Sequence, residues 1–219
     1  MNQLLSRITT ALISGTIFFG TYFLFPMIFN VLMLLILVFI LVFEWPLLSR
    51  NNKWLWLITP IYPTLPILFL IYFTKFRDAN ILIPLYPFLI AWIYDTFAYF
   101  SGVYFGKNKL CPNLSPNKTY EGLFGGFIGV VLANFSFVFY YGYLCCKPHP
   151  GDQVLFHSFL LQSILITFAA FSGDLFISYL KRKAETKDVG VILPGHGGLL
   201  DRFDSVFFVV VILIAMIAR

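Results

Sequence analysis

The sequence predicts an all-α fold, a polytopic transmembrane helix bundle of about seven spans with a cytoplasmic N-terminus. Hydrophobic residues make up 59% of the 219 residues and charged residues only 11%, whereas soluble domains carry about a quarter charged residues. Aromatic residues reach 20%, which suits lipid-facing helices and interfacial belts. Because no polar linker divides the chain, we expect one membrane domain, with N-terminal helices in residues 1–80 and a second half, bearing the polar loops, in residues 81–219.

The expected helices follow from the lengths of the apolar runs and from the breaks between them. A crossing needs roughly 20 apolar residues, so the charge-free run from Ile8 to Phe43 is too long for one helix. Pro26 marks the break within that run, since proline removes a helical hydrogen bond. The fourth and sixth runs each contain one aspartate, Asp95 and Asp174. The expected crossings are residues 8–25, 28–46, 54–73, 81–105, 122–144, 154–181 and 203–218.

The distribution of basic residues predicts the orientation. Cytoplasmic loops of membrane proteins carry an excess of Lys and Arg. With the N-terminus inside, 11 of the 15 Lys and Arg residues fall on the cytoplasmic side and four on the other. The two long polar loops, residues 106–121 and 182–202, are therefore expected to face the cytoplasm.

Three acidic residues fall within or beside the apolar runs, where charges are costly and need a reason. Glu44 lies near a helix end beside Trp45, and we interpret it as an interfacial anchor. Asp95 and Asp174 lie deeper and precede the two polar loops, so they indicate a polar cavity open to the cytoplasm. The alternative is a pair of buried carboxylates that are neutralised by Lys or Arg for packing alone.

The richest polar stretch runs over residues 173–204. On a helix, Asp174, Ser178 and Lys181 share one face because they are spaced i, i+4, i+7. Asp201 and Asp204, spaced i, i+3, share a face of the next helix. Carboxylates without a set of imidazole or thiolate ligands favour a hard cation such as Mg²⁺. Basic side chains suited to phosphate oxygens flank these carboxylates: Lys181, Arg182, Lys187 and Arg202.

Glycines in both loops indicate close backbone approaches. Gly197 and Gly198 follow His196 and permit a positive φ, and we expect the histidine to contact phosphate or backbone rather than zinc. In the other loop, Ser115 followed by Pro116 resembles a helix N-cap, which would place Lys118 at an anion-binding helix terminus. A stripe of small residues for close helix packing follows: Gly122, Gly125, Gly126 and Gly129.

The run from Ser178 to Asp204 resembles the signature of the CDP-diacylglycerol synthases, also called phosphatidate cytidylyltransferases. That signature reads S-x-x-K-R, four residues, K-D, then a loop with H-G-G and a final D-R-x-D. The matching residues are Ser178, Lys181, Arg182, Lys187, Asp188, His196, Gly197, Gly198, Asp201, Arg202 and Asp204. The upstream residues Asp95, Ser115, Pro116, Asn117, Lys118, Thr119, Glu121 and Gly122 are similar to further family elements. One departure is Ile177, where family members commonly carry Glu.

The resemblance implies transfer of a cytidylyl group from CTP to phosphatidate, which yields CDP-diacylglycerol and pyrophosphate for phospholipid biosynthesis. It implies a protein of the bacterial inner membrane with its site facing the cytoplasm, no nucleic-acid partner and a homodimer. In this reading Asp174, Asp201 and Asp204 hold Mg²⁺, and Lys181 and Lys187 act beside them in catalysis. The residues expected to bind substrate are Lys118, Ser178, Arg182, His196, Gly197, Gly198, Arg202, Asp188 and Asp95.

Two other functions remain open at this point. A CTP-dependent polyprenol or lipid kinase would also need Mg²⁺, a nucleotide and a membrane alcohol. An ion-coupled transporter would use Asp95 and Asp174 as ion sites at membrane depth. The dense basic, acidic and glycine residues of loop 182–202 favour a polyphosphate site over a transport gate, and no inverted repeat is visible.

Overall fold

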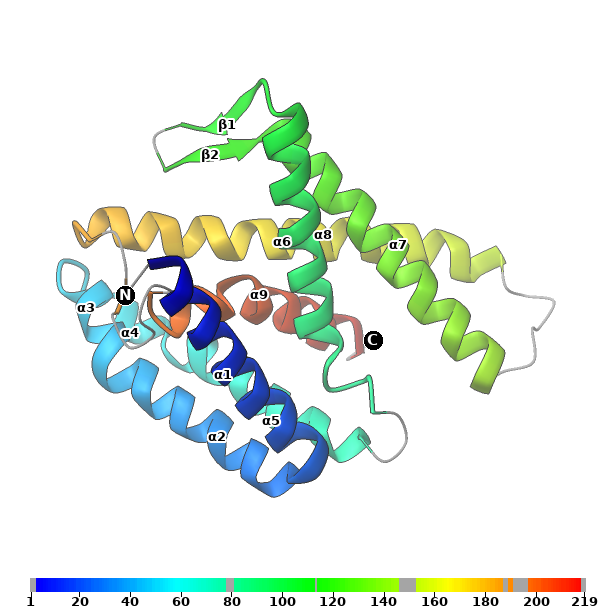
Figure 1. Cartoon of the computed structure of the whole chain (residues 1–219), viewed down its shortest axis with the longest axis horizontal. Coiled ribbons are helices and arrows are strands. Elements are labelled where there is room, and N and C mark those ends of the chain that lie inside the picture. The colour runs from blue at the N-terminus through cyan, green and yellow to red at the C-terminus, as the bar shows by residue number, and fades with distance from the viewer. Residues whose placement is uncertain are drawn as a thin grey trace.

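The computed structural model describes residues 3–77, 81–112, 114–145, 153–186, 189–190 and 197–217. These residues form helices and one short hairpin (Figure 1). The N-terminal elements are α1 (Gln3–Leu24), α2 (Pro26–Phe39), the π-helical turn η1 (Ile40–Glu44), α3 (Trp45–Ser49), α4 (Leu55–Ile58), the π-helical turn η2 (Pro60–Thr64), α5 (Leu65–Phe73) and the 3₁₀ turn η3 (Thr74–Phe76). The remaining elements are α6 (Tyr86–Phe105), β1 (Lys109–Cys111), β2 (Ser115–Thr119), α7 (Tyr120–Cys145), α8 (Gln153–Lys183) and α9 (Leu200–Ile217).

Within the described residues, five helices are long and apolar enough to cross a membrane: Pro26–Ser49, Leu55–Phe76, Tyr86–Phe105, Tyr120–Phe137 and Phe159–Lys183. They coincide with the second to sixth expected crossings, which confirms a helical membrane bundle. The first expected crossing falls in α1, whose apolar part is the shorter helix Leu12–Leu24. The seventh falls in α9, which has three charged residues in its first two turns. Seven crossings and a cytoplasmic N-terminus therefore stay predictions.

The hairpin between α6 and α7 differs from the sequence prediction. Residues 115–119 form strand β2, which pairs antiparallel with β1, so the expectation that Ser115 caps a helix is wrong. The helix begins five residues later, at Tyr120, and its cap is Thr119, whose Oγ1 accepts a hydrogen bond from Gly122 N–H at 3.0 Å. Pro116 fits the hairpin because an edge strand tolerates a residue without an N–H.

Helices α6 and α7 pack closely along the predicted glycine stripe. A Cβ added at Gly125 would lie 1.9 Å from Ser101 Oγ on α6, and one at Gly129 would lie 2.7 Å from the Phe97 ring. A larger residue at either position would require Ser101 or Phe97 of α6 to move. The prediction that the stripe serves close helix packing is confirmed.

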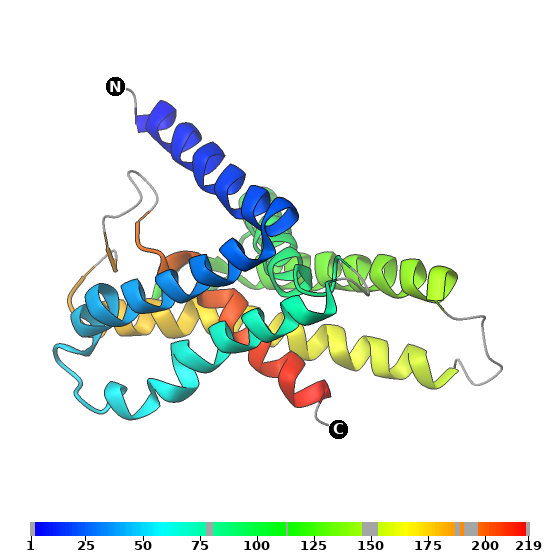
Figure 2. The same ribbon diagram turned by 90° about the horizontal axis from the view of Figure 1, so that it is seen from below.

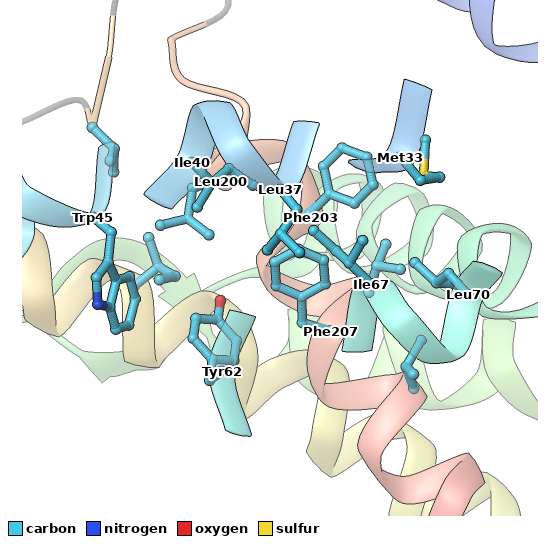
Figure 3. Close-up of a cluster of buried hydrophobic side chains, with 14 of the residues drawn as sticks. Met33, Leu37, Ile40, Trp45, Tyr62, Ile67, Leu70, Leu200, Phe203 and Phe207 are labelled. Atoms are coloured by element: carbon cyan, nitrogen blue, oxygen red, sulfur yellow. The ribbon is translucent and has the colours of Figure 1, made fainter. Parts of the chain in front are cut away.

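The main core joins the N-terminal helices to α9 (Figure 3). Phe207 of α9 packs in it against Tyr62 of η2, with ring centroids 5.4 Å apart. Figure 2 shows α9, in red, running between α5 and α8, and α9 contacts both of these helices. The other labelled members of this cluster are Met33, Leu37, Ile40, Trp45, Ile67, Leu70, Leu200 and Phe203. Helix α9 is thus fixed from both halves of the chain.

Candidate active site

A cavity of about 520 Å³ lies where α6, β2, the start of α7, α8 and the start of α9 meet. We call it the charged cavity. Four carboxylates and three basic side chains line it, from four separate elements: Asp95, Lys118, Asp174, Lys181, Asp201, Arg202 and Asp204. Asp95 and Asp174 thus line one polar cavity, as expected, together with residues of both polar loops; that this cavity opens to the cytoplasm stays a prediction.

Asp174 lies on α8 opposite the hairpin. Its Oδ2 forms an ion pair with Lys118 Nζ of β2, which bridges the charged cavity. Its Oδ1 accepts a hydrogen bond from Ser178 Oγ, one turn along α8, at 3.4 Å. The Lys118 ammonium also lies 5.1 Å from the ring centre of Phe171, a cation–π distance. The expected shared face of Asp174 and Ser178 is therefore present.

Asp201 accepts hydrogen bonds from Lys181 and from the backbone of the residues that precede α9. Its Oδ1 accepts from Lys181 Nζ at 2.8 Å. Its Oδ2 accepts from the backbone N–H groups of Gly198, at 3.2 Å, and Val189, at 3.4 Å. Asp201 thus positions Lys181 and also binds the backbone on both sides of the preceding loop, at Val189 and Gly198. Gly197, next to Gly198, has a φ of 80°, which glycine adopts without strain.

Asp204 lies where α8 and α9 cross. A Cβ added at Gly173, the neighbour of Asp174, would lie 2.3 Å from the backbone O of Asp204, so the two helices touch there through glycine. The Asp204 Oδ1 accepts from the N–H of Ser205 at 2.7 Å. Asp204 lines the same cavity as Asp95, Asp174 and Asp201. The four acidic side chains therefore share one cavity, where their negative charges repel one another.

The donor set of the charged cavity is compatible with a divalent cation. Carboxylate oxygens are the ligands that Mg²⁺ prefers, and four carboxylates outnumber the three basic residues of the lining. In the described residues, however, no three acidic, His or Cys side chains are close enough to enclose one ion. Lys118 and Lys181 occupy oxygens of Asp174 and Asp201, so a cation would compete with these lysines. The residues fit Mg²⁺ by donor type.

Glu44 is the residue whose role the sequence did not reveal, and its interpretation as an interfacial anchor is wrong. It is 1% exposed. Its two carboxylate oxygens accept from the N–H groups of Leu199 and Leu200, each at 2.7 Å. Because these are orphan donors at the start of α9, Glu44 fixes the N-terminus of the helix that bears Asp201. Its partners lie 155 and 156 positions away, so no local pattern could show them.

The Glu44 carboxylate packs directly against the backbone of two glycines, Gly190 and Gly198. A Cβ added at Gly198 would lie 2.7 Å from Glu44 Oε1, and one at Gly190 would lie 2.9 Å from the same atom. The expected close backbone approach in this loop is confirmed for Gly198, and the group that approaches it is the Glu44 carboxylate. Gly198 is not part of the lining of the charged cavity.

The remaining predicted site residues divide into two groups. Ser178 and Arg182 do not line the charged cavity; Arg182 Nε instead donates to the backbone O of Leu114, at 3.5 Å, and so links α8 to the hairpin. Ile177, the departure from the family pattern, is fully buried in the main core. Three predicted residues lie outside the described residues: Lys187, Asp188 and His196.

Comparisons with known proteins agree with the motif. Phosphatidate cytidylyltransferase of Rickettsia typhi is 37% identical over 202 residues, which cover 91% of this chain and 86% of the relative. The enzyme of the same name from Thermotoga maritima is 39% identical over 141 residues, 64% of this chain and 50% of the relative. That from Staphylococcus epidermidis is 42% identical over 142 residues, 65% and 51%.

The chain thus spans about half the length of the Thermotoga and Staphylococcus relatives and most of the Rickettsia relative. The model of the family described as "Cytidylyltransferase family" matches residues 8–219. This match extends over the N-terminal helices, the charged cavity and α9. The chain belongs to the cytidylyltransferase family.

Proposed function

We propose that the chain is a phosphatidate cytidylyltransferase, a nucleotidyltransferase that converts CTP and phosphatidate into CDP-diacylglycerol and pyrophosphate. The observation that carries this proposal is the charged cavity. It joins four carboxylates to three cations among apolar helices and the hairpin, in a chain whose relatives bear this enzyme's name. Two anionic substrates, one of them a lipid, require such a combination.

The reaction requires alignment and charge neutralisation more than proton transfer. An oxygen of the phosphatidate phosphate attacks the α-phosphorus of CTP, and the bond from that phosphorus to the bridging oxygen breaks as pyrophosphate leaves. The second pKa of a phosphomonoester is near 6, so the attacking oxygen is already deprotonated at neutral pH. The protein has to hold two like-charged groups in line.

The basic residues of the charged cavity supply part of that neutralisation. Lys118 and Lys181 are held by Asp174 and Asp201 before substrate binds, and in our proposal they exchange these carboxylates for phosphate oxygens. Arg202 contributes a planar set of donors suited to phosphate. Lys187 would bind phosphate in the same way, as its place in the family motif indicates.

We propose that the expected Mg²⁺ binds in the same cavity through carboxylates among Asp174, Asp201 and Asp204. In the described residues these side chains do not lie close enough together to share one ion, so they would have to approach one another to hold it. When bound, the ion would neutralise charge on the triphosphate. Release of Lys118 and Lys181 from their carboxylates would free oxygens of Asp174 and Asp201 for that role. Asp95 would add its negative charge to the same cavity, which it lines together with Lys118 and Arg202.

We further propose that the charged cavity opens to the cytoplasm and that the protein lies in the bacterial inner membrane, since 11 of 15 basic residues fall on the cavity side of the expected topology. Reaction of purified protein with phosphatidate, Mg²⁺ and α-labelled CTP tests the activity. Label should appear in the lipid, with release of pyrophosphate. Label that enters lipid only from γ-labelled CTP would identify a kinase and overturn the proposal.

A further inference from the structure

A second cavity of about 540 Å³ shares the lining residue Arg202 with the charged cavity. It lies between α1, α2, α6 and the start of α9, and we call it the apolar groove. Apolar side chains make up most of its walls, and five of them are aromatic, among them Phe18, Trp92 and Phe203. Its volume lies within the range of small-molecule sites.

The first turns of α9 separate the two cavities. Arg202 and Phe203 line the apolar groove, whereas Asp201 and Asp204 line the charged cavity. Arg202 lines both. Its long side chain has an apolar stem and a charged head, so it suits a boundary between an apolar and an anionic compartment.

Helix α6 lines both cavities along its length. Phe88 and Trp92, spaced i, i+4, line the apolar groove. Asp95 continues the same face at i+7, and with Ala98 on the next turn it lines the charged cavity. The face of α6 thus changes from apolar to acidic as it passes from one cavity to the other, and the two cavities share the cation Arg202 on α9.

We propose that the apolar groove binds an acyl chain of the lipid substrate while its phosphate lies at Arg202. A phosphatidate molecule has the same two parts, an anionic head and apolar chains. Arg202 lines both cavities, and its positive charge is complementary to a phosphate; these two observations favour this occupant over a helix of a second copy. The inference rests on the proposed function, because it assigns the chain-binding part of the same site.

Two glycines of α1 provide a test and its matched control. Gly15 lines the apolar groove and has no atom within 4 Å of an added Cβ. Gly20, on the same helix, has equally open surroundings but does not line the groove. Gly15→Phe should fill the groove, and Gly20→Phe should place the same ring elsewhere on α1.

The measurement is a comparison of KM values for dioleoyl phosphatidate, dibutyryl phosphatidate and CTP. Gly15→Phe should raise KM for the long-chain lipid by about tenfold, which corresponds to about 1.4 kcal/mol. It should leave KM for CTP and for the short-chain lipid within about twofold, as should Gly20→Phe for all three. Equal effects of the two variants, or an unchanged KM for dioleoyl phosphatidate in Gly15→Phe, would overturn the assignment.

A binding experiment separates this inference from the proposed function. Phosphatidate with a diazirine on its acyl chain, photolysed with the wild-type protein, should label peptides that contain Phe18 or Trp92. The label should persist in Gly20→Phe and be lost in Gly15→Phe, whether or not CTP is turned over. A Gly15→Phe variant that keeps its label but changes the number of protomers in native mass spectrometry would assign the groove to a second copy instead.

Discussion

The substitution Glu44→Gln, which removes one hydrogen-bond acceptor, should reduce the turnover rate even though Glu44 does not line the charged cavity. Glu44 accepts two N–H groups at 2.7 Å at the start of α9, and it does not line the charged cavity. Hydrogen bonds to charged groups are each worth about 1.5–3 kcal/mol. Glu44→Gln keeps one acceptor oxygen and turns an NH₂ group toward the other N–H, so its cost should be about 1.5–3 kcal/mol.

Glu44→Ala removes both acceptors and should cost about 3–6 kcal/mol, a large part of the typical 5–15 kcal/mol of a folded domain. The glutamine variant is therefore the informative one, and the alanine variant sets the upper limit. Because α9 carries Asp201, Arg202 and Asp204, a shift of its first turn displaces three cavity residues together. A misplacement of about 1 Å is able to cost about 100-fold in rate.

The assay combines thermal unfolding in detergent with steady-state kinetics, well below the lowered Tm. Glu44→Gln should lower both Tm and kcat, the latter by about tenfold or more. Glu185→Gln removes one carboxylate from an exposed residue and should behave as wild type. A Glu44→Gln protein with wild-type Tm and kcat would refute the assigned role, and a lowered Tm with unchanged kcat would limit that role to stability.

Three further predictions concern the cation, the acidic group and the helix contact. EDTA should abolish cytidylyl transfer and added Mg²⁺ should restore it; full activity in EDTA would contradict a divalent cation. Asp201→Asn should insert into membranes normally but lose transfer activity by several orders of magnitude, because the charge that faces Lys181 is gone; near-normal kcat would remove Asp201 from the site. Gly125→Val should lower Tm, since its Cβ would meet Ser101 Oγ at 1.9 Å, whereas Gly20→Ala, in open space, should not; equal Tm values would contradict close packing there.

The convergence of the site was predictable from residue type and spacing. Charges are costly in apolar helices, so Asp95 and Asp174 needed partners, and the only dense supply of these was in the two polar loops. The structure brings both aspartates together with Lys118, Lys181 and Asp201. The glycine stripe and the family were predictable for the same reason, because each depends on a pattern local to a few turns. The five candidate spans were predictable from apolar length alone.

The two wrong predictions, for Glu44 and for Ser115–Pro116, concern residues whose structure depends on contacts with other segments of the chain. Glu44 was interpreted from its neighbour Trp45, although its partners lie at the start of α9. Ser115 and Pro116 have the composition of a helix start, but pairing with β1 holds them as a strand. Hydrogen bonding across the hairpin outweighed a local preference worth about 1 kcal/mol. No single-sequence pattern reports such long-range competition.

The close contact at Gly173 determines how near Asp174 on α8 lies to Asp204 on α9. Asp174 follows Gly173, and the Asp204 backbone is the surface that a Cβ there would strike at 2.3 Å. Because the atom in the way belongs to the backbone, it cannot rotate aside as a side chain can, and any substitution requires α8 or α9 to shift. The distance between the two carboxylates is therefore set by the close approach of the helices at this glycine, and a change of residue type there would alter it.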